Sequence, residues 1–172
     1  MKQRIKSKRI FIEKVSAESK VELFNLVNNS RSYLKEWLIW VDSINSIEDE
    51  EKAIKKMEDS WKNNKKYSFV IKEKISNKLI GMISVIKIYK YRKKCEIGYW
   101  LGNEYTRNGF MAEAINILEK EIFSEGFLHI LIQCNEKNKK SVAVAKRNEY
   151  KKYFSKTKNG TKYLFFRKIK SI

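Results

Sequence analysis

The stretch Cys95-Glu-Ile-Gly-Tyr-Trp-Leu-Gly-Asn-Glu-Tyr-Thr-Arg-Asn-Gly-Phe-Met-Ala-Glu-Ala114 decides the fold of this chain. Residues 95–101 alternate with the period of a β-strand. Residues 102–109 carry two glycines and two asparagines, which accept the unusual backbone angles of a turn. From Met111 onward, apolar residues recur at helix spacing. The pattern predicts a strand, a short polar turn and the first turns of a helix.

The start of that helix is a candidate site for an anion. The first backbone N–H groups of a helix have no partner inside it, and the helix dipole places partial positive charge at the same end. Arg107 brings a full positive charge to the turn. Together these groups suit a pyrophosphate.

Strands and helices alternate along the rest of the chain. The patterns predict strands at 8–14, 67–74, 79–89, 129–134, 150–154 and 161–169, and helices at 17–28, 31–41, 46–63 and 135–147. Ser16 and Ser46 are expected helix caps, and Asn159-Gly160 predicts a hairpin turn. Because no repeat, linker or low-complexity block divides the sequence, we expect a single mixed α/β domain over residues 1–172.

Two runs within the quoted stretch resemble a known family. Glu96-Ile-Gly-Tyr-Trp-Leu101 and Tyr105-Thr-Arg-Asn-Gly-Phe-Met-Ala-Glu-Ala114 are similar to the core of the GNAT N-acetyltransferases, most of all the RimJ/RimL type. The phosphate-loop pattern of that family, Gln/Arg-x-x-Gly-x-Gly/Ala, falls on residues 106–111 and keeps only Gly109. The resemblance implies an acyl-CoA N-acyltransferase fold in which two central parallel strands, here 95–101 and 129–134, splay apart and admit acetyl-CoA.

The resemblance also assigns residues to acetyl-CoA, which serves as co-substrate. It implies that the backbone of residues 99–101 contacts the pantetheine arm, that the loop holds the pyrophosphate, and that a side-chain amide binds the arm. The residues so implied are Tyr99, Trp100, Leu101, Thr106, Arg107, Asn108, Gly109, Phe110, Met111 and Asn138. No metal ion is expected, because Cys95 and Cys134 do not have metal-ligand spacing.

Glu96 and Ser141 are the candidate catalytic residues. Acetyl transfer to an amine needs a base for the amine and a proton donor for the leaving thiolate. Many GNAT enzymes use a glutamate on the central strand as base, which implies Glu96; the alternative is a glutamate paired with a lysine at 93–94. RimL-type enzymes place a serine where Ser141 stands, which implies the proton donor; the alternative is a hydroxyl bonded to its own helix backbone.

Three aromatic residues, Tyr33, Trp37 and Trp40, share one face of the helix predicted at 31–41. Such a stripe is most often part of the core. The segment Tyr33-Leu-Lys-Glu-Trp-Leu-Ile-Trp40 also resembles RimJ/RimL-type proteins, where the first helices cover the acceptor site. By that resemblance the three side chains form a wall of the substrate pocket.

The net charge of +18 has two explanations that the sequence leaves open. It favours an acidic partner such as the ribosome, or it reflects the Lys-, Asn- and Ile-rich composition of an AT-rich genome, since the lysines are spread along the chain. No apolar run is long enough to span a bilayer, so we expect no membrane partner. Two cysteines give no disulfide framework, which favours a cytoplasmic location. Whether the protein forms a homodimer is a question that the sequence leaves open.

The predicted function is acetyl-CoA-dependent acetylation of a primary amine. By the resemblance, the acceptor is a protein N-terminus or a small molecule such as an amino-nucleotide antibiotic, a polyamine or an aminoglycoside. The alternative is a basic ribosome- or nucleic-acid-binding protein that has the same fold without catalysis.

Overall fold

Eight strands form one mixed sheet in the computed structural model, which describes residues 1–171. The spatial order is β1-β2-β3-β4-β5-β6-β8-β7. The pairing of β5 with β6 is parallel, and the other neighbours are antiparallel. The strands are β1 (Arg4–Lys6), β2 (Ile10–Lys14), β3 (Tyr67–Glu73), β4 (Leu79–Tyr89), β5 (Lys94–Leu101), β6 (His129–Asn135), β7 (Lys151–Lys158) and β8 (Thr161–Ile169). The mixed α/β class is confirmed.

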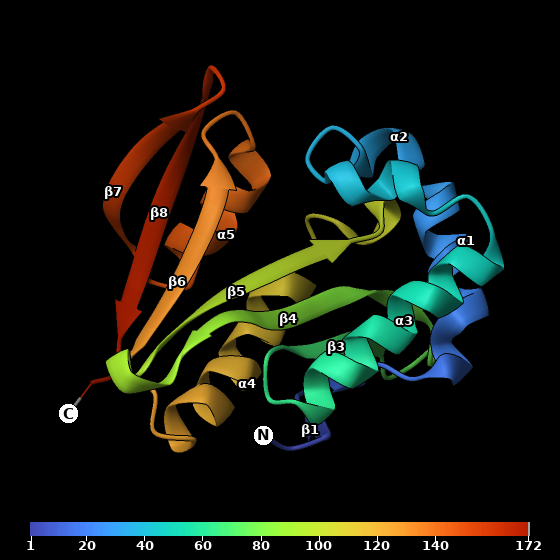
Figure 1. Cartoon of the computed structure of the whole chain (residues 1–172), viewed down its shortest axis with the longest axis horizontal. Coiled ribbons are helices and arrows are strands. Elements are labelled where there is room, and N and C mark those ends of the chain that lie inside the picture. The colour runs from blue at the N-terminus through green and yellow to red at the C-terminus, as the bar shows by residue number, and fades with distance from the viewer. Residues whose placement is uncertain (172) are drawn as a thin grey trace.

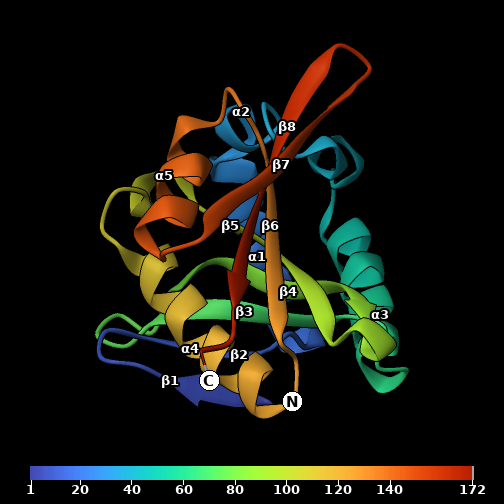
Figure 2. The same ribbon diagram turned by 90° about the vertical axis from the view of Figure 1, so that its left-hand side faces the viewer.

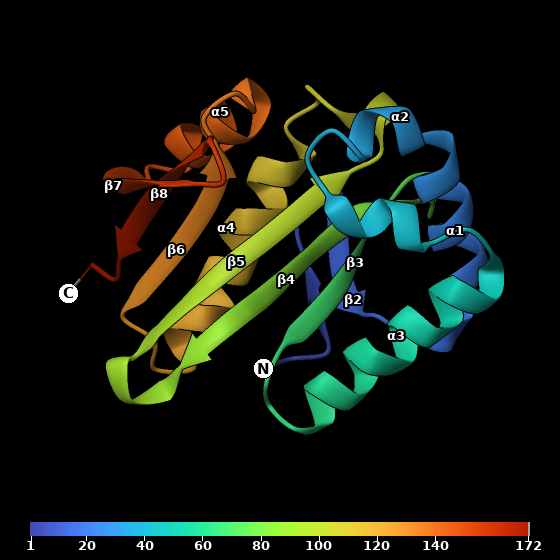
Figure 3. The ribbon, with the colours of Figure 1, turned by 45° about the horizontal axis from the view of Figure 1, so that its top comes forward.

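Helices cover both faces of the sheet, as Figures 1 and 3 show. They are α1 (Lys20–Asn29), α2 (Arg31–Leu34), α3 (Ile47–Lys62), α4 (Phe110–Ser124) and α5 (Lys139–Arg147). The apolar stripe of α4, which includes Ile115, Leu118 and Ile122, packs on one face in the largest buried cluster. Leu23 of α1 and Ile54 of α3 pack on the opposite face. The middle strands are therefore packed on both faces, while the sheet opens at one end.

The opening lies between β5 and β6. Their pairing runs only from Lys94 opposite His129 to Ile97 opposite Ile132, although β5 continues to Leu101 and β6 to Asn135. Beyond Ile97 the two strands diverge, which is plain in Figure 1. The expected splay of the two central parallel strands is confirmed.

The helix predicted at 31–41 is wrong in its extent. Helix α2 ends at Leu34, and a 3₁₀ turn at Ile39–Ser43 follows after an extended residue. The guanidinium of Arg31 donates to the carbonyl oxygen of Val41 at 2.8 Å and also to that of Ile44. Residues 39–44 fold back toward Arg31, and its guanidinium supplies hydrogen bonds to their carbonyl groups. These carbonyls therefore do not need the hydrogen bonds of a continuous helix.

Other boundaries differ by a few residues. The predicted helix at 135–147 begins only at Lys139, after the cap Asn138, and Ser16 makes no capping hydrogen bond. The Ser46 cap is confirmed, because its side chain accepts from the Asp49 N–H. Strand β7 extends to Lys158, and Asn159 and Gly160 form the predicted turn with φ angles of 47° and 71°.

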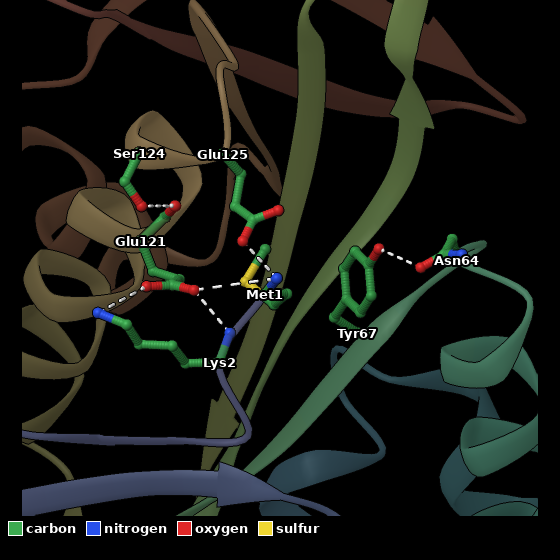
Figure 4. Close-up of polar contacts among 7 residues, drawn as sticks. All are labelled: Met1, Lys2, Asn64, Tyr67, Glu121, Ser124 and Glu125. Atoms are coloured by element: carbon green, nitrogen blue, oxygen red, sulfur yellow. Dashed lines mark hydrogen bonds and ion pairs between the residues drawn. The ribbon is translucent and has the colours of Figure 1, made fainter.

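The start of the chain is fastened to the end of α4 (Figure 4). The amino group of Met1 forms ion pairs with Glu125 and, at 4.0 Å, with Glu121. The Lys2 N–H donates to Glu121 at 2.6 Å, and close by the Tyr67 hydroxyl donates to Asn64 at 2.8 Å. The contacts of Met1 and Lys2 hold the β1 edge of the sheet against α4. Among the described residues, no helix combines the length and the apolar character needed to cross a bilayer.

Candidate active site

A cavity of about 720 Å³ occupies the gap between the splayed strands. On the α4–α5 side its walls include Met111, Ala112 and Ser141, and on the α2 side they include Tyr33 and Trp37. Side chains of β5 alternate between the two faces of the sheet. Tyr99 therefore points toward α5, and Glu96 and Trp100 point toward the face that carries α1 to α3. The cavity thus connects the two faces of the sheet, and two molecules can meet within it.

The loop before α4 is held in an unusual conformation. Arg107 and Gly109 have φ angles of 68° and 79°, and both residues line the cavity. Arg9, in the turn just before β2, contacts this loop: its Nη1 donates to the Asn108 carbonyl at 2.9 Å and its Nε to Glu113 at 2.8 Å. The loop therefore presents the free N–H groups at the start of α4, together with Arg107, to the cavity.

Lysine and arginine side chains of α5 complete the positive end of the cavity. Lys140 and Arg147 line it. The Lys140 ammonium lies 3.4 Å from the Thr106 hydroxyl and 4.4 Å from the centre of the Tyr33 ring, so it bridges α5, the loop and α2. The three charges and the helix N-terminus form a site of the kind that binds phosphate groups.

Glu96 lies on the opposite side of the gap and is 7 % exposed. Both of its carboxylate oxygens accept from the Lys87 ammonium at 3.0 Å. Lys87 sits at an irregularity of β4 with a φ of 48°, and its ammonium also reaches the Gln133 side chain at 3.4 Å. The partner is therefore Lys87 and not a lysine at 93–94. The ion pair fixes both carboxylate oxygens of Glu96 on the acceptor side of the gap.

Ser141 belongs to a small polar cluster on the α5 side. Its backbone N–H donates to the Asn138 side chain at 3.0 Å, and its hydroxyl lies 3.2 Å from the Tyr99 hydroxyl. Burial raises the pKa of Tyr99 well above its usual range, so this phenol stays protonated, and either hydroxyl of the pair can be the donor. Burial likewise raises the pKa of the Cys134 thiol, against a smaller opposite effect of a hydrogen bond with Ser141.

Twelve of the fifteen residues that the sequence selected line this cavity: Tyr33, Trp37, Glu96, Tyr99, Trp100, Leu101, Thr106, Arg107, Gly109, Met111, Asn138 and Ser141. Trp40, Asn108 and Phe110 do not. Trp40 packs on Trp100 with ring centres 5.8 Å apart, and Asn108 and Phe110 line a separate hollow with Arg9. The oxygen of Asn138 caps α5, which leaves its amide NH₂ to donate elsewhere.

Sequence reasoning missed Lys87, Gln133 and Tyr163. The first contacts Glu96 directly, and the other two line the cavity from β6 and β8. In the sequence, Lys87 looks like any exposed lysine of a strand, and nothing in the pattern predicts the irregular backbone at this residue. Gln133 and Tyr163 gain their position from strand register, which only the paired sheet supplies.

Comparison with known proteins decides the family. Residues 9–151 match the family described as acetyltransferase (GNAT) domain. The protein belongs to the GNAT acetyltransferase family. A curated relative, the ribosomal-protein-serine acetyltransferase of Escherichia coli (strain K12), is 30% identical over 137 residues, which cover 78% of this chain and 75% of that one.

Solved structures show the same GNAT fold. RimL, the ribosomal L7/L12 α-N-protein acetyltransferase in complex with coenzyme A, has a TM-score of 0.89, 22% identity, and coverage of 96% of this chain and 97% of its own. The microcin C7 self-immunity acetyltransferase MccE, in complex with acetyl-CoA and AMP, has a TM-score of 0.88 and 26% identity over 95% of this chain and 93% of its own. The GNAT assignment makes this chain an acetyltransferase, so the alternative of a binding protein without catalysis is set aside.

Proposed function

We propose that this acetyltransferase moves an acetyl group from acetyl-CoA to the α-amine of a polypeptide N-terminus, in the cytoplasm. The observation that carries the proposal is the cavity that joins a phosphate-type site at α4 to a carboxylate on the other face of the sheet. The Escherichia coli relative, which is named for acetylating a serine of a ribosomal protein, supports the choice of acceptor. Two unpaired cysteines agree with a reducing compartment.

The residues on the α4–α5 side fit acetyl-CoA. The N–H groups at the start of α4, with Arg107, Lys140 and Arg147, match a diphosphate in charge. Beyond Ile97, β5 pairs with β4 on one side only, so the backbone groups on its β6-facing edge are free to bind the amides of a pantetheine arm. Acetyl-CoA supplies the acetyl group in the activated form of a thioester.

Two side chains then move the protons. Glu96 accepts the proton that an ammonium must lose before its lone pair attacks the acetyl carbon. The Ser141 hydroxyl donates a proton to the sulfur as the C–S bond breaks. The Tyr99 hydroxyl lies 3.2 Å from the Ser141 hydroxyl, and either can be the donor; in this step Tyr99 donates to the Ser141 oxygen and favours the proton transfer. No covalent bond to the protein is needed.

Acetyl-CoA binding is tested first by thermal and chemical denaturation. At a hundredfold excess over its Kd, acetyl-CoA is expected to raise the free energy of unfolding by about 2.7 kcal/mol. The informative variant is Ala112→Glu, because Ala112 lines the cavity in the first turn of α4. A glutamate there suits the helix dipole but repels a diphosphate.

The matched control is Ala112→Gln, which has the same size and no charge. We expect acetyl-CoA to bind Ala112→Glu at least about tenfold more weakly than Ala112→Gln, given the strength of a charge pair at 4 Å in a partly buried site. Release of free CoA thiol then reports turnover with N-terminal peptides, with N-terminally blocked peptides as the negative control. The proposal is contradicted if acetyl-CoA does not stabilise the protein, or if thiol is released as fast with N-terminally blocked peptides as with free ones.

Ser141→Ala is expected to lower kcat about tenfold to a hundredfold and to leave the Kd for acetyl-CoA within about twofold, since general-acid assistance contributes at or above this level. Tyr99→Phe is the companion variant, because it removes the hydroxyl that supports Ser141 and keeps the ring. It should lower kcat less than Ser141→Ala does. A large loss of acetyl-CoA binding in Ser141→Ala would instead mark the serine as structural, and stopped-flow or calorimetric titration distinguishes the two outcomes.

A second acceptor class has one observation in its favour. MccE, which resembles this chain at 26% identity, holds AMP together with acetyl-CoA. Tyr33 and Trp37 line the α2 side of the cavity here and offer flat faces for a nucleobase. An aminoacyl-nucleotide analogue therefore belongs in the acceptor panel beside peptides, polyamines and aminoglycosides. A kcat/KM for this analogue above that of every peptide would favour the second class.

A further inference from the structure

The positive charge of this protein is concentrated at its C-terminal end. Residues 137–172 contain thirteen of the 38 Lys and Arg residues but only one of the 20 Asp and Glu residues, Glu149. This segment therefore carries a net charge of +12 out of the total of +18. The lysines are indeed spread along the chain, but the acidic residues that balance them elsewhere are missing here. The segment folds as α5 and the β7–β8 hairpin.

The hairpin stands out from the body of the protein (Figure 2). Strand β7 is the edge of the sheet, and all eight of its residues are exposed. In the part of the chain that the structure describes, no carboxylate forms an ion pair with any of its four lysines, Lys151, Lys152, Lys156 and Lys158. By contrast, Lys162 and Lys168 of β8 pair with Glu136 and Glu119 at 2.8 and 2.9 Å. Four of the positive charges without a carboxylate partner thus lie along the outer strand.

Part of this charge faces the acceptor side of the cavity. Lys156 is paired with Tyr163 and Lys158 with Thr161, and both β8 residues line the cavity. Directly opposed residues of neighbouring strands share a face, so these two lysines point to the same side as the cavity wall. Farther along, Phe154 stacks on Phe165 with ring centres 4.2 Å apart, which stiffens the hairpin. A chain that leaves the cavity on this side passes a basic strand.

We infer that the hairpin binds an acidic segment of the acceptor polypeptide, so that the substrates are proteins whose N-terminal residues are followed by a run of Asp and Glu. The inference rests on the proposed function and names its substrate class. An acceptor α-amine is itself cationic, and a surface this basic repels it unless the attached chain brings negative charge. Lysine ammonium groups on flexible stems suit a diffuse acidic segment, whereas Arg is the side chain that recognises phosphate with two hydrogen bonds.

The test compares three peptides that share their first three residues. Strand β7 has eight residues and so spans about 26 Å, which an extended segment of about eight residues matches. Positions 4–11 are therefore acidic, neutral Gln/Asn or basic. The wild-type kcat/KM should be at least about tenfold higher for the acidic than for the neutral peptide at 50 mM salt, as electrostatic steering provides. The ratio should fall toward one at about 0.5 M salt, where the field is screened within a few ångströms.

Two variants place this preference on the hairpin. Replacing all four β7 lysines with glutamine should bring the acidic-to-neutral ratio close to one. The double reversal Lys156→Glu with Lys158→Glu should lower the ratio below one and favour the basic peptide. A control that removes four exposed lysines elsewhere, and so makes the same change in net charge, should keep most of the preference: Lys55, Lys56, Lys65 and Lys120, each to glutamine.

The possible failures are distinct. If wild type acetylates acidic and neutral peptides equally well, the hairpin inference is overturned and the proposed function stands. The same holds if the control variant loses as much preference as the hairpin variant, or if the hairpin lysines instead govern the binding of a labelled RNA oligonucleotide. If no peptide is acetylated under any condition, the proposed function itself fails.

Discussion

Glu96→Gln is expected to lower kcat about 10²- to 10⁴-fold, the usual contribution of a positioned general base. Glutamine has nearly the same shape as glutamate and still reaches the Lys87 ammonium, but it accepts no proton at neutral pH. The carboxylate it replaces is buried, with both oxygens 3.0 Å from that ammonium, so solvent does not easily take over its task. The measurement is CoA thiol release at saturating acetyl-CoA. Acetyl-CoA binding should be unchanged.

The pH dependence of this deficit identifies the acceptor as well as the base. A peptide α-amine loses its proton at a pKa of about 7.7–8.0, whereas an alkylamine such as Lys does so near 10.4. Above pH 8 a peptide amine is already neutral, so the deficit of Glu96→Gln should be largest at pH 6–7 and shrink by pH 9. For an alkylamine it should persist at pH 9. Glu104→Gln, at an exposed glutamate in the turn after β5, is the control and should leave kcat unchanged. A kcat of Glu96→Gln within about threefold of wild type at pH 6.5 removes Glu96 as the base.

Gly98→Leu is expected to lower kcat/KM for the acceptor at least about a hundredfold while acetyl-CoA still stabilises the protein. Gly98 is the first β5 residue beyond the last pair with β6, and it lies on the same face as Glu96. A Cβ at this position meets only the Ile86 side chain, at 3.4 Å, and no positive φ requires glycine. The backbone therefore accepts a Cβ here, and we expect the rest of a leucine side chain to extend into the acceptor side of the gap. We expect the free energy of unfolding to change by less than about 2 kcal/mol.

The graded series Gly98→Ala, Gly98→Val and Gly98→Leu provides the control for this variant. Alanine adds only the Cβ that the site accommodates, so most activity should remain, and each larger side chain should remove more. Acetyl-CoA titration and acceptor kinetics on the same samples separate the two sides of the gap. Unchanged acceptor kinetics in Gly98→Leu would mean that the amine does not approach along this face.

Local pattern predicted most of the fold. Alternation located the strands at 67–74 and 79–89 within a residue, and side-chain chemistry located the Ser46 cap and the Asn159-Gly160 turn. The helix at 31–41 failed because Arg31 forms contacts ten and thirteen residues farther along the chain, which no periodicity reveals. The family resemblance supplied the splay of the central strands, and pairing that stops at Ile97 confirms it.

The candidate site was only partly accessible to sequence. The loop before α4 and the residues of β5 were found because they are contiguous. The partner of Glu96 was not found, because Lys87 lies on the neighbouring strand β4 and contacts Glu96 only where the backbone of that strand is irregular. The excess of positive charge at the hairpin was not predicted either, because the distribution of lysines alone does not show where carboxylates are missing. The catalytic roles of Glu96 and Ser141 stay predictions that the variants above test.

The passage through the sheet has a consequence for inhibitor design. Because the cavity is reached from both faces, a ligand can extend from the α4–α5 side to the α2 side without crossing any strand. A single compound that joins a pantetheine-like half to an acceptor-like half by a short bridge would thread the gap. Once one half is bound, the other is held at an effective concentration in the millimolar range for a short flexible bridge, so such a bisubstrate compound should bind far more tightly than either half alone.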